Sequence, residues 1–151
     1  MSLSQQEISD RMEINDVLVR YTRAIDQRDY ELLDTCFTED AHLDYTASGG
    51  IKGEYPEVRA WLEKALAQFD AMMHMIGNVV IELDGDEARS GTYLMNPMGM
   101  KSGSGGLSFF TVGGEYVDRL VRTPGGWKIR ERIEKQTYLQ GGLPDNIQAP
   151  D

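Results

Sequence analysis

The sequence predicts an α+β fold in which helices cover one face of a curved sheet. Hydrophobic residues recur at about 3.6-residue intervals, the period of helices, over residues 4–37 and again over residues 56–69. From residue 72 onward they follow the two-residue period of strands, with short turns between the strands. Because most of the strands follow the helices, the order favours an antiparallel sheet over a doubly wound α/β fold.

The first helix is predicted over residues 4–25. Ser4 followed by Glu7 is a capping-box pattern at its start. Six apolar residues form a single stripe that we expect to be buried, namely Ile8, Met12, Val17, Leu18, Tyr21 and Ile25. A shorter helix is predicted from Asp29 to Phe37, with Asp29 as its N-cap.

A strand and a third helix follow. Residues 39–45 alternate so that Leu43 and Tyr45 point inward while His42 points to solvent. The third helix begins near Pro56, a residue favoured in the first turn, and it carries Trp61.

The next strand is predicted over residues 72–84. Its alternation places His74 on one face together with Ile76, Asn78 and Val80. Because one imidazole on a mostly apolar strand specifies no chemistry by itself, a structural role for His74 stays open.

The remaining sequence predicts an antiparallel meander. Asp84-Gly85-Asp86 is a hairpin turn into a strand over residues 87–96. The Gly- and Ser-rich residues 97–106 are predicted to form a loop; they lack the Gly-Lys-Ser/Thr ending of a phosphate-binding loop. A strand over residues 107–121 with a bulge at Gly113-Gly114 and a last strand over residues 127–138 complete the sheet.

Length and composition limit the class of protein. The 151 residues predict a single domain spanning residues 1–151, with a core over about residues 4–138 and a flexible tail over about residues 140–151. A net charge of -10 argues against nucleic-acid binding and favours a small apolar or aromatic ligand. The single cysteine, Cys36, excludes an intrachain disulfide and is expected in the core.

No apolar run is long enough to span a membrane, so we expect no membrane partner and a cytoplasmic protein. No Cys/His zinc spacing or HExxH pattern is present, so we expect no metal site. We also expect no cofactor, because the acid–base residues described below support a reaction without one.

Several short motifs, taken in order, resemble a SnoaL-like protein of the nuclear transport factor 2-like superfamily. They are Tyr21-x4-Asp26, Phe37-Thr38-Glu39-Asp40-Ala41, His74-x3-Asn78, Asp84-Gly85-Asp86 and Gly126-Trp127-Lys128-Ile129. The resemblance implies a cone-shaped barrel with the N-terminal helices packed over the concave face of the sheet. It also implies association through the outer face of the sheet into homodimers or homotrimers.

Within that superfamily, the sequence is similar to scytalone dehydratase and the bile acid 7α-dehydratases. The resemblance implies that Asp26, Tyr45 and His74 face one cavity, and that Tyr21 joins them as in the bile acid branch. The second acid or imidazole that those enzymes carry on the next strand is missing, because that region reads Met95-Asn96-Pro97-Met98. Asn96 can still hydrogen-bond a substrate oxygen.

These side chains support proton transfer. A neutral imidazole, with an ordinary pKa of about 6.5, can act as a general base, and a carboxylate within reach fixes its tautomer. The phenols of Tyr21 and Tyr45 can stabilise an enolate or help a hydroxyl to leave. The set of His74, Asp26, Tyr21 and Tyr45 therefore predicts dehydration or double-bond isomerisation of a hydroxylated or keto-bearing ring compound.

An apolar cavity wall is the other part of the predicted site. The candidate substrate-binding residues are Asn96, Trp61, Met95, Met98 and Phe110. Six methionines are expected to give that wall an adaptable surface, namely Met72, Met73, Met75, Met95, Met98 and Met100.

Each residue also has a structural interpretation. The two tyrosines can be half-buried and bonded to backbone groups, and Asp26 can cap the second helix or pair with Arg23 or Arg28. Two non-catalytic functions therefore stay open: a partner like the small β subunit of ring-hydroxylating dioxygenases, and a ligand-binding domain with the same cavity.

Overall fold

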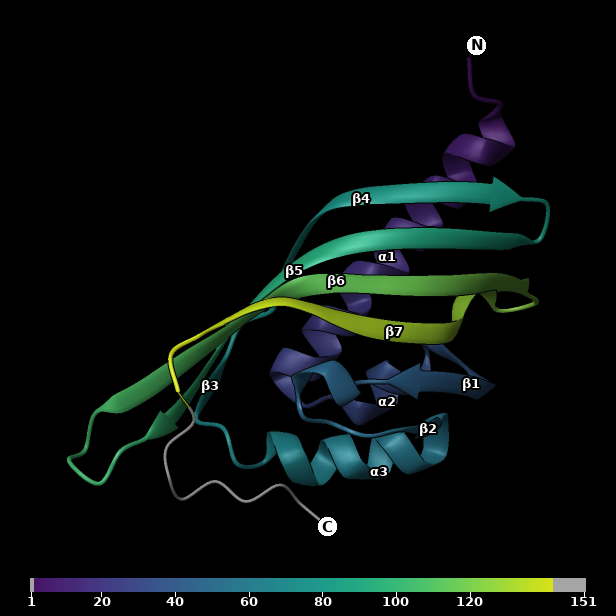
Figure 1. Ribbon diagram of the computed structural model, residues 1–151. Coiled ribbons are helices and arrows are strands. Elements are labelled where there is room, and N and C mark those ends of the chain that lie inside the picture. The colour runs from purple at the N-terminus through teal and green to yellow at the C-terminus, as the bar shows by residue number, and fades with distance from the viewer. Residues whose placement is uncertain (1, 143–151) are drawn as a thin grey trace.

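The computed structural model of the protein describes residues 2–142 and confirms the α+β fold (Figure 1). The helices are α1 (Gln5–Gln27), α2 (Tyr30–Asp34), α3 (Tyr55–Leu66) and the 3-10 turn η1 (Thr46–Ser48). The strands are β1 (Phe37–Asp44), β2 (Lys52–Glu54), β3 (Ala71–Met72), β4 (Met75–Asp84), β5 (Glu87–Lys101), β6 (Leu107–Thr123) and β7 (Gly126–Gln140). The predicted flexible tail falls mostly on residues 143–151, which lie outside the described residues.

The seven strands form one strongly curled sheet in the order β2-β1-β7-β6-β5-β3, and β4 pairs with the other half of the β5 edge. All pairs are antiparallel except β1 with β7, which run parallel. In Figure 1, α1 runs along one face of the sheet and α3 lies below its β1 end. The helices cover the concave face, as predicted.

Helix α1 has the predicted start and only part of the predicted stripe. The capping box forms, with Ser4 Oγ accepting from the Glu7 N–H at 3.1 Å and the Ser4 N–H donating to Glu7 at 2.7 Å. Ile8 and Met12 were expected inside but are 47% and 65% exposed. The first turns are instead held by Asp10, which is 3% exposed.

Asp10 is bonded to three side chains. It accepts from Arg122 at 2.7 and 2.8 Å, from the Trp127 indole at 3.0 Å and from Gln6 at 3.0 Å. A buried carboxylate needs such partners. The N-terminal part of α1 is therefore attached to the sheet by hydrogen bonds and not by apolar contacts.

The second helix is shorter than predicted. Asp29 is its N-cap, as expected, and accepts from the Leu32 N–H at 2.9 Å. The helix ends at Asp34, because the Cys36 carbonyl already accepts from the Ile129 N–H of β7 at 2.8 Å and Phe37 opens β1. Cys36 is fully buried, as predicted.

The predicted loop over residues 97–106 is also too long. Strand β5 continues through Pro97 to Lys101, fully paired with β6, so the loop is reduced to residues 102–106. Pro97 lies opposite the break between β3 and β4, where its carbonyl accepts from the Met73 N–H at 3.3 Å.

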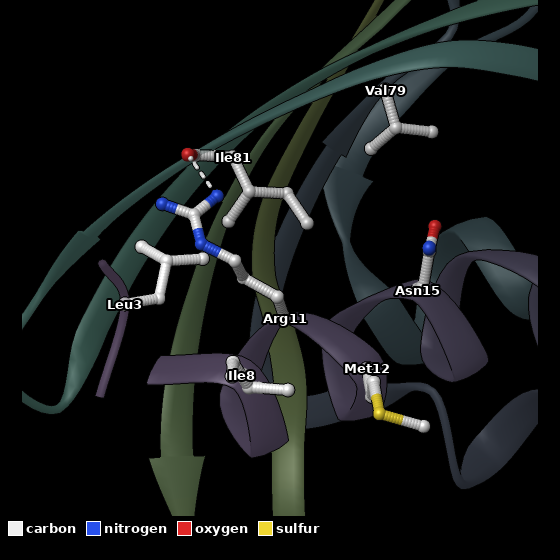
Figure 2. A pocket seen from close by; sticks show the side chains of 7 residues that line it. All are labelled: Leu3, Ile8, Arg11, Met12, Asn15, Val79 and Ile81. Atoms are coloured by element: carbon white, nitrogen blue, oxygen red, sulfur yellow. Dashed lines mark hydrogen bonds between the residues drawn. The ribbon is translucent and has the colours of Figure 1, made fainter. Parts of the chain in front are cut away.

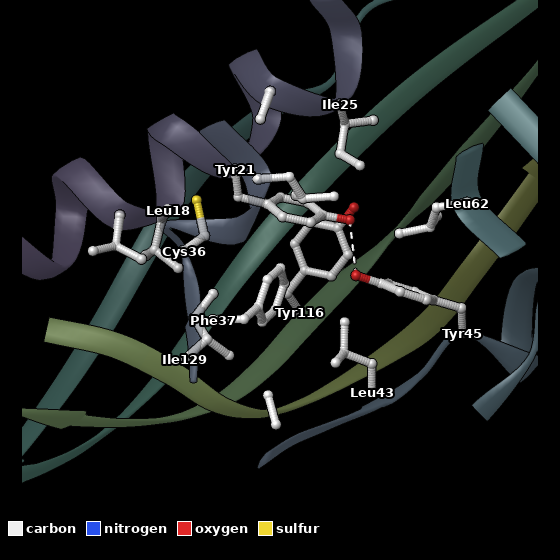
Figure 3. Packing of buried hydrophobic residues seen from close by; sticks show 14 of the residues in the cluster. Leu18, Tyr21, Ile25, Cys36, Phe37, Leu43, Tyr45, Leu62, Tyr116 and Ile129 are labelled. Atoms are coloured by element: carbon white, nitrogen blue, oxygen red, sulfur yellow. Dashed lines mark hydrogen bonds between the residues drawn. The ribbon is translucent and has the colours of Figure 1, made fainter. Parts of the chain in front are cut away.

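The core lies between α1, α3 and the concave face of the sheet. In Figure 3, Leu18 and Ile25 of α1 lie on one side of the core, and Leu43, Phe37 and Ile129 of the sheet lie on the other. Aromatic rings fill its centre: Tyr21 meets Tyr116 edge-on at 5.6 Å, and Phe37 stacks on Tyr55 at 4.8 Å. Within residues 2–142, no helix has both the length and the apolar character needed to span a bilayer.

Candidate functional site

A cavity of about 630 Å³ opens next to this core, between α1, α3, the loop over residues 47–50 and the concave sheet. This volume is within the roughly 300–1,000 Å³ typical of small-molecule sites. The polar lining residues include Tyr21, Tyr45, Ser48, Gln68, His74, Asn96, Tyr116, Glu134 and Gln136. The apolar ones include Ile25, Trp61, Leu62, Leu66, Phe69, Met98, Phe110, Val112 and Leu139.

His74 is bonded to Asp26 through both its backbone and its ring. The His74 N–H donates to the Asp26 carboxylate at 2.9 and 3.2 Å, and Nδ1 lies 2.6 Å from Asp26 Oδ1. The imidazole side chain is 5% exposed, and the carboxylate behind it is 19% exposed. A carboxylate on Nδ1 favours the tautomer with the proton there, which leaves Nε2 as the proton acceptor.

This contact depends on a break in the predicted strand. β3 ends at Met72 and β4 begins at Met75, so Met73 and His74 lie between two strands that pair with different halves of β5. The His74 N–H therefore has no strand partner, and Asp26 accepts from it instead. The predicted continuous strand over residues 72–84 is wrong at this point.

The prediction of which residues share a face with His74 is also wrong beyond Ile76. Asn78 has a left-handed backbone with φ of 50°, and the register with β5 shifts between Gly77 and Val80. This bulge reverses the alternation, so Val80 is 63% exposed while Val79 packs against the core. His74 and Ile76 share the inner face with Val79, not with Asn78.

Arg28, two residues after Asp26, connects the ends of two helices close to the His74–Asp26 pair. It follows α1 in a left-handed conformation and donates to the Leu66 carbonyl at 3.1 and 3.2 Å and to the Phe69 carbonyl. These bonds join the end of α1 to the end of α3, just before the chain reaches His74. The alternative pairing of Asp26 with Arg28 is not observed.

The two predicted tyrosines meet in the cavity wall. The hydroxyls of Tyr21 and Tyr45 lie 2.9 Å apart, and Figure 3 shows them pointing toward each other. Gly50 allows the loop to fold back over Tyr45, because a Cβ there would lie 2.8 Å from the Tyr45 Cβ. Burial raises the pKa of both phenols, more strongly for Tyr45, so both are neutral hydrogen-bond donors at neutral pH.

A buried ion pair lies behind the tyrosines. Arg132 donates to Asp118 at 2.8 and 2.7 Å, and both side chains are fully buried. The guanidinium lies over the faces of Tyr21 and Tyr116, 4.1 and 4.0 Å from the centres of these two nearly perpendicular rings. These two cation–π contacts help to orient both rings in the cavity wall.

Four of the five predicted ligand-binding residues line the cavity: Trp61, Asn96, Met98 and Phe110. Met95 does not, because it is 55% exposed on the outer face of the sheet. Since neighbours in a strand point to opposite faces, the inward Asn96 forces Met95 outward. The predicted methionine wall is wrong for the same reason: Met73 and Met75 are also exposed, and of the six methionines only Met98 lines the cavity.

Sequence analysis missed Glu134, a carboxylic acid on β7 that lines the cavity and is 7% exposed. Alternation from the buried Trp127 and Ile129 would place it outside. However, Leu120 pairs with Ile129 while Arg119 pairs with Glu131, so Arg130 is an extra residue that reverses the faces of β7. The bulge brings Arg132 and Glu134 inside and leaves Ile133 48% exposed.

A second hollow of about 300 Å³ lies between the start of α1 and β4 (Figure 2). Ile8, Met12, Val79 and Ile81 line it, and its one charged residue, Arg11, donates to the Ile81 carbonyl at 2.9 Å. It contains no acid–base pair. Among residues 2–142, no group of three or more His, Cys, Asp or Glu side chains is placed to hold a metal ion.

Comparison with known proteins agrees with this architecture. A model of the SnoaL-like domain matches residues 6–133. An uncharacterized protein of Mycobacterium tuberculosis is 45% identical over 136 residues, which cover 90% of this chain and 91% of that protein.

Two solved structures share the fold. A "Putative Scytalone Dehydratase" from Novosphingobium aromaticivorans superposes with a TM-score of 0.82 at 17% identity, covering 97% of this chain and 95% of that one. The hexachlorocyclohexane dehydrochlorinase LinA-type3 from Novosphingobium barchaimii superposes with a TM-score of 0.73 at 17% identity, covering 95% and 97%. At such identities the likeness concerns the fold alone.

Proposed function

Because the chain belongs to the SnoaL-like domain family, we propose that it is a cofactor-independent lyase or isomerase. Its substrate is a ring compound with a keto group, and His74 removes a proton from the carbon next to that group. The fold is shared with dehydratases and dehydrochlorinases. The reaction itself is inferred from the side chains of the cavity.

The observation that carries this proposal is the contact between His74 and Asp26. Nδ1 is held at 2.6 Å by the carboxylate, so Nε2 is the nitrogen left for a substrate. The carboxylate also stabilises the imidazolium formed when the base accepts a proton. An imidazole held in this way is suited to general base catalysis, which contributes roughly 10²–10⁴-fold to a rate.

The tyrosine pair supplies the group that receives the developing negative charge. In the Tyr21–Tyr45 hydrogen bond one phenol donates to the other, and the second phenol keeps its proton for a ligand oxygen. A neutral donor placed in a buried wall stabilises an enolate with little reorganisation. The aromatic and apolar wall of Trp61, Phe69 and Phe110 would hold the rings of the substrate.

Exchange of α-protons tests the proposal without knowledge of the natural substrate. 1-Tetralone, a bicyclic ketone, is incubated with the protein in D2O, and loss of its C2 proton signal is followed by NMR. We expect His74→Ala to lower the catalysed rate by roughly 100-fold or more. The exposed His42 provides the matched control, and His42→Ala should leave the rate unchanged.

The stability of the variants separates a catalytic role from a structural one. His74→Ala should lower the free energy of unfolding by no more than about 1–2 kcal/mol in urea titrations. Full exchange activity in that variant would contradict the assignment. Binding of 1-tetralone by the wild type without any exchange would favour a non-catalytic ligand-binding domain, and co-purification with an iron–sulfur protein would favour a dioxygenase-type partner.

A further inference from the structure

Among residues 2–142, Glu134 is the one carboxylic acid that lines the cavity. It lies on β7 beyond the Arg130 bulge, and its side chain reaches the same cavity as His74. Within residues 2–142, its Oε1 is buried and has no hydrogen-bond partner. A buried acid that lines a cavity and has an unused oxygen is available to a ligand.

Within the described part of the chain, no positively charged side chain forms an ion pair with Glu134. The nearest arginine on its own strand, Arg132, is committed to Asp118 through two hydrogen bonds. Burial raises the pKa of the Glu134 carboxyl, and the effects of Ser48, His74, Arg132 and Tyr116 offset this only in part. The acid form of Glu134 is therefore favoured relative to a carboxylate in water.

We propose that Glu134 is a second catalytic residue, which donates its proton to a hydroxyl group leaving from the carbon β to the substrate carbonyl. This inference rests on the proposed function. The related dehydratases carry a second acid or imidazole on the strand that here contains Asn96. In this protein Glu134 supplies the second acid from a different strand, β7. The site is then built to eliminate water and not only to shift a double bond.

The proposed step balances without an oxidant or a reductant. His74 Nε2 takes the proton from the α-carbon, and the electron pair of that C–H bond forms the C=C bond. The C–O bond to the β-hydroxyl breaks, and the Glu134 proton converts the leaving group to water. After this step His74 carries an extra proton and Glu134 is a carboxylate. Loss of the His74 proton to solvent and uptake of a proton from solvent by Glu134 restore the starting state.

A matched pair of probes isolates the role of Glu134. 3-Hydroxy-1-tetralone must lose hydroxide or water, whereas 3-acetoxy-1-tetralone loses acetate, a leaving group that needs no proton. Both eliminations give 1-naphthol, which is followed by absorbance. We expect Glu134→Gln, which keeps the size of the side chain, to slow loss of water by roughly 100-fold. Loss of acetate needs no proton from Glu134, so the ratio of the rate of water loss to the rate of acetate loss should fall by at least about tenfold in Glu134→Gln.

The outcomes separate this inference from the proposed function. Loss of all three activities in His74→Ala, together with selective loss of dehydration in Glu134→Gln, supports both. Unchanged dehydration in Glu134→Gln overturns the role of Glu134 alone. A wild type that is inactive with every probe contradicts the proposed function, and the catalytic role of Glu134 fails with it. In an active wild type, a neutral carboxyl band in the infrared spectrum at pH 7 that disappears in Glu134→Gln supports the inference, and its absence overturns it.

Discussion

Asp26 fixes His74 through two kinds of hydrogen bond, one to the backbone and one to the ring. A side chain held at two points loses rotational freedom before a ligand arrives. Such preorganisation is what proton transfer requires, because the base must already be aimed at the reacting bond. In the proposed mechanism Asp26 positions and stabilises His74, and it does not itself line the cavity.

Replacing Asp26 with Asn tests this role. An amide still accepts from the backbone N–H but cannot stabilise an imidazolium, so we expect α-proton exchange to fall by roughly 10²–10⁴-fold. The free energy of unfolding should change by no more than about 1–2 kcal/mol in urea titrations. Asp16→Asn, an exposed change on the same helix, is the control. Retention of full activity in Asp26→Asn would contradict the dyad.

The Arg132–Asp118 pair is expected to dominate stability at the residue scale. Removing one member leaves the other charge buried without a partner, so Asp118→Asn should cost about 3–5 kcal/mol in chemical denaturation. Glu131→Gln provides the comparison, because it removes a surface pair with Arg119 whose side chains are 47% and 51% exposed. That change should cost less than about 1 kcal/mol. Equal losses in the two variants would contradict this account.

At the scale of elements, the start of α1 depends on Asp10. Hydrogen bonds from Arg122, and then from Trp127 and Gln6, hold the pKa of Asp10 well below its ordinary value. A lowered folded-state pKa stabilises the protein above the unfolded-state pKa of 3.8, and this stability is lost as the pH falls below it.

Asp10→Asn should therefore destabilise the protein by about 1.5–3 kcal/mol at pH 7. The difference from the wild type should stay constant between about pH 5 and 8 and narrow below about pH 4. Thermal unfolding over that pH range measures it. A difference that does not depend on pH would show that packing, and not charge, anchors the helix.

Strand β7 carries two extra residues that shape the cavity. Arg130 is one, and Thr137 is the other, because Gly113 pairs with Tyr138 while Gly114 pairs with Gln136. The predicted bulge thus occurs at Gly113-Gly114, with its extra residue on the partner strand. The glycines permit close approach: a Cβ at Gly114 would lie 2.0 Å from the Lys135 carbonyl oxygen.

Gly114→Ala should accordingly destabilise the protein by about 1–3 kcal/mol, because backbone must move. Gly113→Ala is the control. Its Cβ would meet the ring of Tyr138, which is 41% exposed and can turn aside. We expect a smaller loss there in the same urea titrations. A greater loss for Gly113→Ala would show that the ring, and not the strand backbone, sets the packing.

At the scale of the whole molecule, the outer face of the sheet exposes large apolar side chains. Tyr93, Met95, Phe109, Ile133 and Tyr138 are between 41% and 58% exposed. They lie on neighbouring strands, where Met95 pairs with Gly113 and Gly113 with Tyr138. We propose that this face joins copies of the chain into a homodimer or homotrimer.

Ile133→Glu should then lower the molar mass measured by light scattering to that of one 17.0 kDa chain. A charge placed in an apolar contact between copies is not solvated, which opposes association. Met12→Glu changes a still more exposed apolar residue, at the hollow of Figure 2, and should leave the oligomer intact. A wild type that is monomeric at micromolar concentration would contradict the proposal.

The sequence by itself determined the fold class and the order of most elements, and it pointed to some of the residues at the cavity. Local signals were sufficient here: the capping box at Ser4, the N-cap at Asp29, the Asp84-Gly85-Asp86 turn and the alternation that turns Tyr45 inward. The family resemblance added the expectation that Tyr21, Asp26, Tyr45 and His74 share one cavity. The structure brings Tyr21, Tyr45 and His74 to its wall and Asp26 behind it.

Tertiary structure alone decided which face several strand residues present. A single extra residue reverses the alternation beyond it, and neither the bulge at Asn78 nor that at Arg130 leaves a periodic signal in the sequence. The break before Met75 depends on two strands sharing one edge of β5. For this reason the sequence identified His74, whereas Glu134 became visible only when β7 was paired with its neighbour.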